Sequence, residues 1–183
     1  ILIIPYGLGQ KVEFKKGKGP ILEECDPKKI LAAEETDVIK KFKPIYQAIN
    51  QVKNKTKKNV IGFTGAPWTL LLYMLNKESP KNNFNFNLIT KNKLLVNQLL
   101  EKLVNIIVFH IVKQIEAGAD IIQIFDSWAG LLPKKDLPNY CFNPTLEILQ
   151  RVKKFGVPVI CFPKDIKESY SDFCSIVKPD CIS

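Results

Sequence analysis

Polar side chains stand where two apolar segments of the chain end. Asp126 and Ser127 follow the apolar run 121–125, and Lys164 follows the apolar run 157–162. In parallel α/β folds, polar side chains at the carboxyl ends of strands point into the ligand site. Asp and Ser also cap turns, and Lys164 can either attract a ligand carboxylate or pair with its acidic neighbour. The residues alone leave these alternatives open.

A third strand end lies in the run 61–70, where an apolar strand turns at once into a helix. Gly62 and Gly65 let the backbone bend or be approached closely, and Pro67 stands where the first helical residue is expected. Such a junction places free N–H groups and a positive helix end at the carboxyl edge of the sheet. An ordinary tight turn between strand and helix explains the same residues.

Apolar runs and helix signals alternate along the chain. Strands are expected at residues 1–5, 12–14, 60–63, 121–125 and 157–162, with another starting at 180–183; helices are expected from Asp26, at 45–52, from Pro67, at 94–116, from Asn143 and at 169–177. The strands are apolar throughout, which is typical of strands covered on both faces. This order predicts βαβ units, a parallel sheet and one α/β domain or part of one.

The charge balance does not by itself indicate a partner. The chain has 183 residues and a net charge of +9, and Arg151 is its only arginine. The lysines gather in asparagine-rich loops at 53–59 and 77–93, without the interleaved aromatic and arginine residues of a base-stacking groove. Solvated surface loops are therefore favoured over a nucleic-acid patch.

Several kinds of site are excluded by what the chain lacks. The five cysteines form no CxxC pair, which fits reduced thiols better than disulfides, and His110 is the only histidine. His110 lies in an apolar helical stretch and is expected to be packed, not catalytic. Neither a phosphate-binding GxxxxGK[ST] motif nor GxGxxG occurs. We also expect no stretch to approach the roughly 20 apolar residues of a membrane span.

Four blocks of the chain together resemble the uroporphyrinogen decarboxylase family. They are residues 62–70 with Tyr73 and Met74, residues 115–130, residues 157–160 with Lys164, and residues 17–20. The blocks follow the family's order and span essentially the whole chain. Together they are specific, although none of them is specific alone.

The resemblance implies a (β/α)8 TIM barrel, of which residues 1–183 form a partial, central portion as a single domain. It implies removal of CO2 from the four acetate side chains of uroporphyrinogen III to give coproporphyrinogen III, without cofactor or metal. Tyr73 is then the catalytic residue and contacts substrate, Ser127 binds a peripheral carboxylate, and Phe63 lines the pocket. The family also implies a homodimer in the cytoplasm or a plastid, with neither nucleic acid nor membrane as partner.

Some family features have no counterpart in this sequence. The family's aspartate, which meets the central pyrrole N–H groups, directly precedes the segment that matches residues 1–4. The arginine-rich N-terminal segment and the C-terminal histidine are also absent, and both ends of the chain read as cut. Only about half of a barrel's eight strands are expected. We therefore expect the isolated chain not to decarboxylate porphyrinogen.

Two alternatives belong to other functional classes. Zinc-dependent methyltransferases acting on corrinoid or thiol substrates share the barrel and bind zinc through cysteine and histidine at strand ends. Cys161 lies at such an end, but no histidine is near it in the sequence. The other alternative is a non-catalytic nucleic-acid-binding domain that depends on its lysines, for which steep salt dependence is expected.

Overall fold

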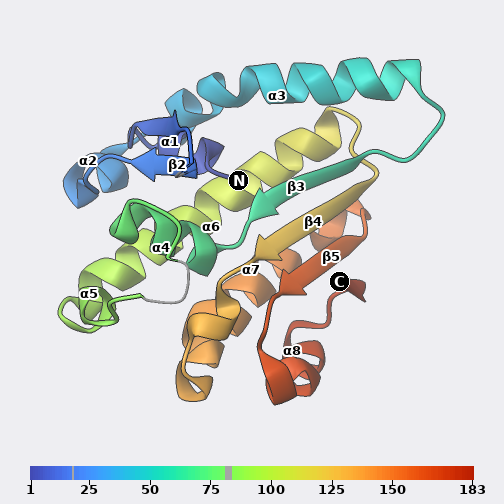
Figure 1. The fold of residues 1–183 in the computed structure, drawn as a ribbon. Helices are drawn as coiled ribbons and strands as arrows, with labels where there is room; N and C mark the ends of the chain where they lie inside the picture. Colours follow the sequence, from blue (N-terminus) through green and yellow to red (C-terminus); the bar gives the residue numbers. More distant parts are fainter. Residues whose placement is uncertain (18, 81–83) are drawn as a thin grey trace.

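The computed structural model describes residues 1–17, 19–80 and 84–183 (Figure 1). The helices are α1 (Ile3–Gly7), α2 (Pro27–Ala32), α3 (Glu35–Lys55), α4 (Pro67–Asn76), α5 (Asn87–Thr90), α6 (Lys93–Glu116), α7 (Asn143–Val152) and α8 (Tyr170–Val177). The strands are β1 (Val12–Lys15), β2 (Gly19–Leu22), β3 (Ile61–Gly65), β4 (Ile121–Asp126), β5 (Val159–Pro163) and β6 (Cys181–Ile182). The predicted alternation of strands and helices is confirmed from β3 onward.

The main sheet is parallel, with the strand order β3-β4-β5-β6. Ile61 pairs with Ile121, and Ile122 pairs with Val159. Helices α6 and α7 lie behind this sheet in Figure 1. The strand residues on the covered face are buried, namely Gly62 and Thr64 in β3, Ile122, Ile124 and Asp126 in β4, and Val159, Cys161 and Pro163 in β5. Within the described residues the sheet is open and does not close into a barrel.

The opposite face of the sheet carries the alternate residues of each strand. In β3 these are Ile61 and Phe63, which are 48% and 50% exposed. Their neighbours on β4 and β5 are partly buried. The expectation that the strands are covered on both faces is therefore correct for only one face in the described part of the chain. We call the other the open face.

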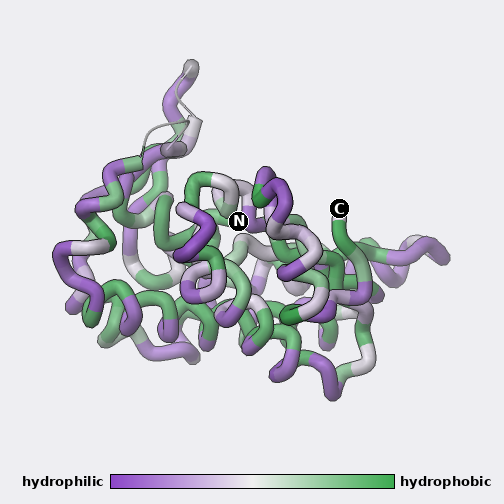
Figure 2. Tube along the Cα trace, turned by 90° about the horizontal axis from the view of Figure 1, so that it is seen from below, coloured by the Kyte–Doolittle hydropathy of each residue, from purple (hydrophilic) through white to green (hydrophobic). Residues whose placement is uncertain are grey.

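Helix α6 forms the centre of the core behind the sheet. Its buried residues include Leu99, Leu103, Ile106 and Ile107, which recur at three- and four-residue steps. Contrary to the expectation from sequence, α6 is long and apolar enough to cross a membrane by length and composition, but 56% of that stretch is buried inside the fold. Figure 2 shows hydrophobic and hydrophilic stretches alternating along the helices, as amphipathic packing requires.

The predicted strand at residues 1–5 is wrong, because this segment forms the short helix α1. The helix is closed by hydrogen bonds such as Leu8 N to Ile4 O, at 3.0 Å. A short apolar run does not distinguish a buried helix from a buried strand. Tertiary packing decides the outcome here: a Cβ on Gly7 would lie 2.5 Å from the Phe42 ring of α3, so the two helices approach closely.

Helix α3 begins ten residues earlier than the predicted helix at 45–52 and continues through Pro44. Pro44 is exposed, whereas Val38 and Phe42 in the preceding turns are buried. Packing of these two side chains outweighs the hydrogen bond that the proline removes. The predicted helix start at Asp26 is confirmed, since its carboxylate accepts hydrogen bonds from Lys28 N and Lys29 N.

The short hairpin β1–β2 confirms the strand expected at residues 12–14. Val12 pairs with Leu22 in antiparallel register. Gly17 and Gly19 have φ of +78° and +80°, which only glycine adopts easily. Lys18, within the family block at 17–20, lies outside the described residues.

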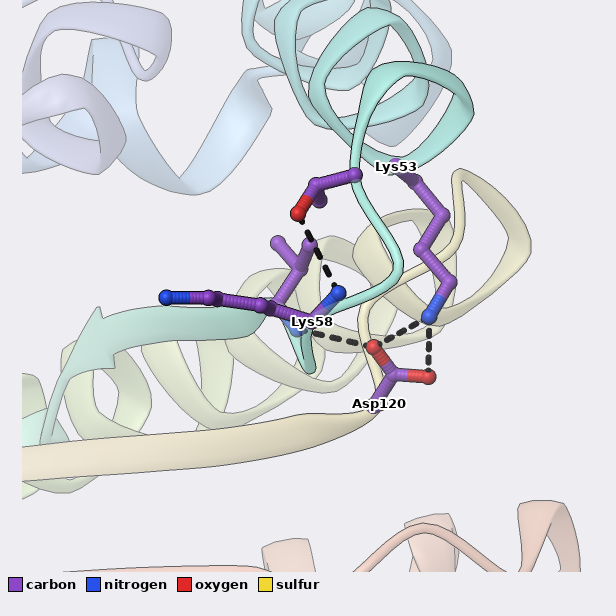
Figure 3. Close-up of polar contacts among 5 residues, drawn as sticks. Lys53, Lys58 and Asp120 are labelled. Atoms are coloured by element: carbon purple, nitrogen blue, oxygen red, sulfur yellow. Dashed lines mark hydrogen bonds and ion pairs between the residues drawn. The ribbon is translucent and has the colours of Figure 1, made fainter.

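Aspartates at the amino edge of the sheet fix the starts of neighbouring strands, and Figure 3 shows one of them, Asp120. Asp120, just before β4, accepts a 2.8 Å hydrogen bond from Val60 N and is 2.7 Å from Lys53 Nζ. Asp180, just before β6, accepts a 2.8 Å bond from Val159 N in the same way. This edge lies opposite the carboxyl ends of the strands, so these contacts serve stability.

Asp120→Ala is expected to lower the melting temperature, because Val60 N–H and Lys53 both lose their partner. A shift of roughly 2–4 °C corresponds to the loss of a cap-type hydrogen bond in a chain of this size. Asp120→Asn, which keeps an acceptor for the amide, is expected to lose less. Differential scanning calorimetry measures the shift, with Glu101→Ala on exposed α6 surface as the control. Equal melting temperatures for Asp120→Ala and the wild type would contradict this role.

Candidate active site

Three phenylalanines form a row across the open face near the carboxyl ends of β3, β4 and β5. The ring centroids of Phe63 and Phe125 are 6.0 Å apart at 82°, and those of Phe125 and Phe162 are 5.8 Å apart at 74°. These edge-to-face contacts are a favourable geometry for aromatic pairs. The aromatic row, Phe63, Phe125 and Phe162, is therefore a continuous apolar surface that crosses three neighbouring strands.

The junction from β3 to α4 is closed by tight packing. Ala66 N donates a 2.9 Å hydrogen bond to Phe125 O, and Pro67 begins the helix, as predicted. A Cβ on Gly65 would lie 2.8 Å from Ile1 Cγ2 and 3.0 Å from Leu70 Cδ2, so only glycine fits. The contact places Ile1 beside the carboxyl end of β3.

Tyr73 lies on α4, one helical turn after Thr69. Its partly buried ring meets the Trp128 ring edge-to-face, with centroids 6.5 Å apart. No described residue forms a hydrogen bond with the Tyr73 hydroxyl. The phenol is therefore not committed to a partner among these residues.

The turn after β4, residues 127–130, is held against α4 by hydrogen bonds. Trp128 N donates to Thr69 Oγ1 at 3.2 Å, and Trp68 Nε1 donates to Trp128 O at 2.9 Å. Ser127, the first residue of this β4 turn, is partly buried. The two aromatic rings and the threonine thus fix where the Ser127 backbone lies relative to α4.

Asp126 points to the covered face, not into a ligand mouth. Thr69 Oγ1 donates a 2.7 Å hydrogen bond to Asp126 Oδ1, and the carboxyl is 3% exposed. Asp126 does not cap the β4 turn directly either, because its carboxylate bonds Thr69, and Thr69 in turn accepts the hydrogen bond from Trp128 N. Burial raises the pKa of Asp126 to about 6, although the hydrogen bond from Thr69 favours the charged form.

Lys164 follows β5 and adjoins the β4 turn. Its amide donates to Asp126 O at 3.1 Å, and its carbonyl accepts from Gly130 N at 2.9 Å. Lys164 Nζ is 3.9 Å from Asp165 Oδ2, and both side chains are about half or more exposed. The pairing alternative is therefore present but weak, and the ammonium group remains accessible at this edge.

His110 and Asp126 are buried titratable groups with opposite effects on stability. Burial lowers the pKa of His110 to about 4, and its Nδ1 is 2.9 Å from the Tyr46 hydroxyl, which confirms a packed histidine. Between pH 4 and 6.5, His110 carries a proton in the unfolded chain but not in the folded chain, so the free energy of unfolding rises with pH. Between pH 3.8 and 6 the folded Asp126 keeps a proton that the unfolded one releases, so stability falls with pH.

We expect these two slopes to cancel largely in the wild type and to separate in single variants. Asp126→Asn leaves the histidine contribution, so stability should rise by about 3 kcal/mol from pH 4 to 6.5. His110→Gln leaves the aspartate contribution, so stability should fall by a similar amount from pH 3.8 to 6. Urea unfolding across this pH range measures both. Parallel profiles for the two variants would show that these groups do not set the pH dependence.

The profile of the family named uroporphyrinogen decarboxylase (URO-D) matches residues 1–183, the whole chain. The chain belongs to the uroporphyrinogen decarboxylase family. It is 34% identical over 189 residues to uroporphyrinogen decarboxylase of Rickettsia bellii (strain RML369-C), covering 100% of this chain and 55% of that protein. The corresponding proteins of Rickettsia canadensis (strain McKiel) and Rickettsia felis (strain ATCC VR-1525 / URRWXCal2) are each 33% identical, with 56% and 54% of their lengths covered. The chain thus spans about half the length of these relatives.

The residues that the decarboxylase resemblance selects lie on β3, on α4 and in the β4 turn. Tyr73 contacts Trp128, the residue that follows Ser127, and Phe63 lies on the open face in the aromatic row. None of them lines the cavity of about 510 Å³ beside Trp68 and Tyr140, which lies among α4, α5 and α6. Their assignment to a shared ligand site therefore stays a prediction.

Sequence reasoning gave no role to Thr69, which lies inside the family block and joins α4 to the β4 turn. Phe125 and Phe162 were not selected either. The alternation of side chains along the strands predicts that Phe125 and Phe162 lie on the same face of the sheet as Phe63, so the sequence could have identified them. The bond from Thr69 to Asp126 had no signal, because it joins side chains 57 residues apart.

The zinc-methyltransferase alternative receives no support from Cys161. Its side chain lies on the covered face and is 1% exposed, and burial raises the pKa of this thiol to about 12. A zinc ligand must be a thiolate that faces an accessible position. Among residues 1–17, 19–80 and 84–183, no three His, Cys, Asp or Glu side chains gather as a metal site.

Proposed function

We propose that the chain is the central part of a (β/α)8 barrel and carries the tetrapyrrole-binding mouth of a uroporphyrinogen decarboxylase. In this proposal the open face is the inner wall of the barrel, and helices α6 and α7 belong to its outer ring. The carboxyl ends of β3, β4 and β5 form the mouth, where ligands of such barrels bind. The family match and the names of the relatives support the reaction.

The observation that supports the proposal is the aromatic row on the open face, together with the contact between Tyr73 and the β4 turn. Phe63 is half exposed, Ser127 directly follows β4, and Tyr73 on α4 contacts the ring of Trp128, the next residue after Ser127. A flat macrocycle can cover the row while its peripheral carboxylates meet the Tyr73 and Ser127 hydroxyls and the Lys164 ammonium. Hydrogen bonds to carboxylates are among the stronger ones, because the acceptor is charged.

The chemistry needs a proton and a place for positive charge. Protonation of a pyrrole carbon makes a cation; the bond from the acetate methylene to its carboxyl carbon then breaks, and its electron pair neutralises the ring. CO2 leaves, the methylene carbon takes a proton, and the ring carbon returns one, so each step replaces CO2 by H⁺. An oriented phenol such as Tyr73 can hold the reacting carboxylate or support the group that stabilises the cation.

The charge anchor for that cation is proposed to lie next to Ile1. The family's aspartate precedes the segment matching Ile1, and Ile1 packs against Gly65 at the mouth. A carboxylate in that position would stand beside β3, within the same opening. The residue encoded before Ile1 tests this point directly, and any residue other than aspartate or glutamate would contradict it.

We expect the 183-residue chain to bind uroporphyrin III, the stable oxidised form of the substrate, but not to produce coproporphyrinogen from uroporphyrinogen. Quenching of tryptophan emission measures binding, and chromatography of the oxidised products measures turnover. Ser127→Ala and Tyr73→Phe should weaken binding several-fold, with Ser175→Ala on exposed α8 as the matched control. Turnover comparable to that of a full-length relative would contradict the predicted inactivity of the chain. Absence of uroporphyrin binding would contradict a tetrapyrrole-binding site at the carboxyl ends of β3, β4 and β5.

A further inference from the structure

One buried contact joins the two segments that carry Tyr73 and Ser127. Thr69 precedes Tyr73 by one turn on α4, and Asp126 directly precedes Ser127. The Thr69 hydroxyl donates to Asp126 Oδ1 at 2.7 Å and accepts from Trp128 N at 3.2 Å. Both side chains are buried, at 0% and 3% exposure.

We propose that Thr69 and Asp126 are positioning residues that set the separation of Tyr73 and Ser127 at the mouth. The proposal rests on the proposed function of those two side chains. Asp126 touches no ligand in this account. It acts through Thr69, and Thr69 acts through the backbone of Trp128.

The direction of the hydrogen bonds makes the pair specific. A threonine hydroxyl has one proton, and giving it to the Asp126 carboxylate leaves a lone pair for Trp128 N–H. Asp126 therefore fixes the orientation of Thr69, and the charged acceptor strengthens the bond. Rotation of the hydroxyl would leave either the carboxylate or the Trp128 amide without its partner.

A purely structural contact would not need a carboxylate here. Asp126 Oδ2 is buried and has no well-formed hydrogen bond among the described residues; the Cys141 thiol, on the segment before α7, is a weak donor close to the carboxylate, and the Cys161 thiol of β5 also lies near it. A buried, partly satisfied carboxylate costs stability, and an apolar residue of similar size would not. The cost is understandable if the carboxylate holds the β4 turn in one position.

Thr69→Val and Thr69→Ser distinguish a positioning role of the Thr69 hydroxyl from a purely structural packing role of its side chain. Valine keeps the shape of threonine and loses the hydroxyl, whereas serine keeps the hydroxyl. In Thr69→Val we expect the Trp128 amide to exchange with solvent at least tenfold faster, measured by NMR hydrogen exchange. The Ile122 amide, bonded to Pro158 O at 3.0 Å, is the internal reference and should not change. Thr69→Ser should retain protection of Trp128. Unchanged protection in Thr69→Val, or equal loss in Thr69→Ser, would overturn the proposal.

Asp126→Asn provides a second measurement should Thr69→Val fail to fold. Trp68 and Trp128 are the only tryptophans, and both adjoin the pair. Wild-type emission should show a step near pH 6 as Asp126 ionises, and Asp126→Asn should abolish it. A step that persists in Asp126→Asn would show that Asp126 is not coupled to the turn.

Binding of uroporphyrin III separates failure of this inference from failure of the proposed function. Thr69→Val should weaken binding about tenfold, and Thr69→Ser should leave it within a factor of about three. If the wild type binds no uroporphyrin, the proposed function fails, while the exchange of the Trp128 amide still decides the positioning role. If Thr69→Val binds as tightly as the wild type, the positioning role at the mouth is wrong.

Discussion

Replacing Gly130 with alanine is expected to displace the β4 turn and to lower the free energy of unfolding by about 3 kcal/mol, the upper part of the range for overpacking. A Cβ there would lie 2.6 Å from Asp165 Cβ and 2.8 Å from Asp165 O. The surroundings cannot move aside, because Gly130 N and Lys164 O are hydrogen-bonded at 2.9 Å. Urea unfolding followed by tryptophan emission measures the loss.

The matched control for this prediction is Gly156→Ala. Gly156 has φ of +67°, and a Cβ there would have nothing within 4 Å, so its alanine variant carries backbone strain without crowding. We expect a loss of about 1 kcal/mol there. A Gly130→Ala variant as stable as the wild type would show that the turns after β4 and β5 are not packed together as described.

Removing the central ring of the aromatic row is expected to have the largest effect on ligand binding. Phe125 contacts both Phe63 and Phe162, so Phe125→Ala breaks the row in two. The Kd for uroporphyrin III should rise at least tenfold, because a buried aromatic contact of this kind contributes more than about 1.4 kcal/mol. Fluorescence titration at fixed ionic strength measures the change.

Phe14→Ala is the control for Phe125→Ala, since Phe14 is 80% exposed on the β1–β2 hairpin. It should leave uroporphyrin binding unchanged. Equal affinities of Phe125→Ala and the wild type would mean that the row does not contact the ligand. Equal weakening by both variants would indicate non-specific adsorption to exposed phenylalanines.

The sequence predicts the elements around the candidate site better than those at the start of the chain. Gly65 and Pro67 identify the β3–α4 junction, and the apolar runs before Ser127 and Lys164 identify β4 and β5. These signals are local and agree with the packing. Pro5, Gly7 and Gly9 mark the end of the first apolar run but do not show whether it is a strand or a helix, so packing against α3 decides between them.

The candidate site itself is only partly readable from residue types. Family motifs select Phe63, Tyr73 and Ser127 because they lie in local blocks. Asp126 looks like a mouth residue from its position at a strand end. Strand alternation places Asp126 on the same face as Ile122 and Ile124, but the sequence does not show that this face is covered at the strand end. The partner that accommodates the buried carboxylate, Thr69, is 57 residues away and is found only in the structure.

The most direct test of the account is to map where uroporphyrin III binds, by NMR of the labelled chain during titration. We expect shifts at Phe63, Phe125, Tyr73 and Ser127, which persist when salt is raised. With a net charge of +9, the competing result is attraction of the carboxylates to the lysine-rich segment 53–59, which comprises the end of α3 and the loop before β3 at the opposite edge of the sheet. Shifts confined to that segment and lost at high salt would contradict a tetrapyrrole site on the open face.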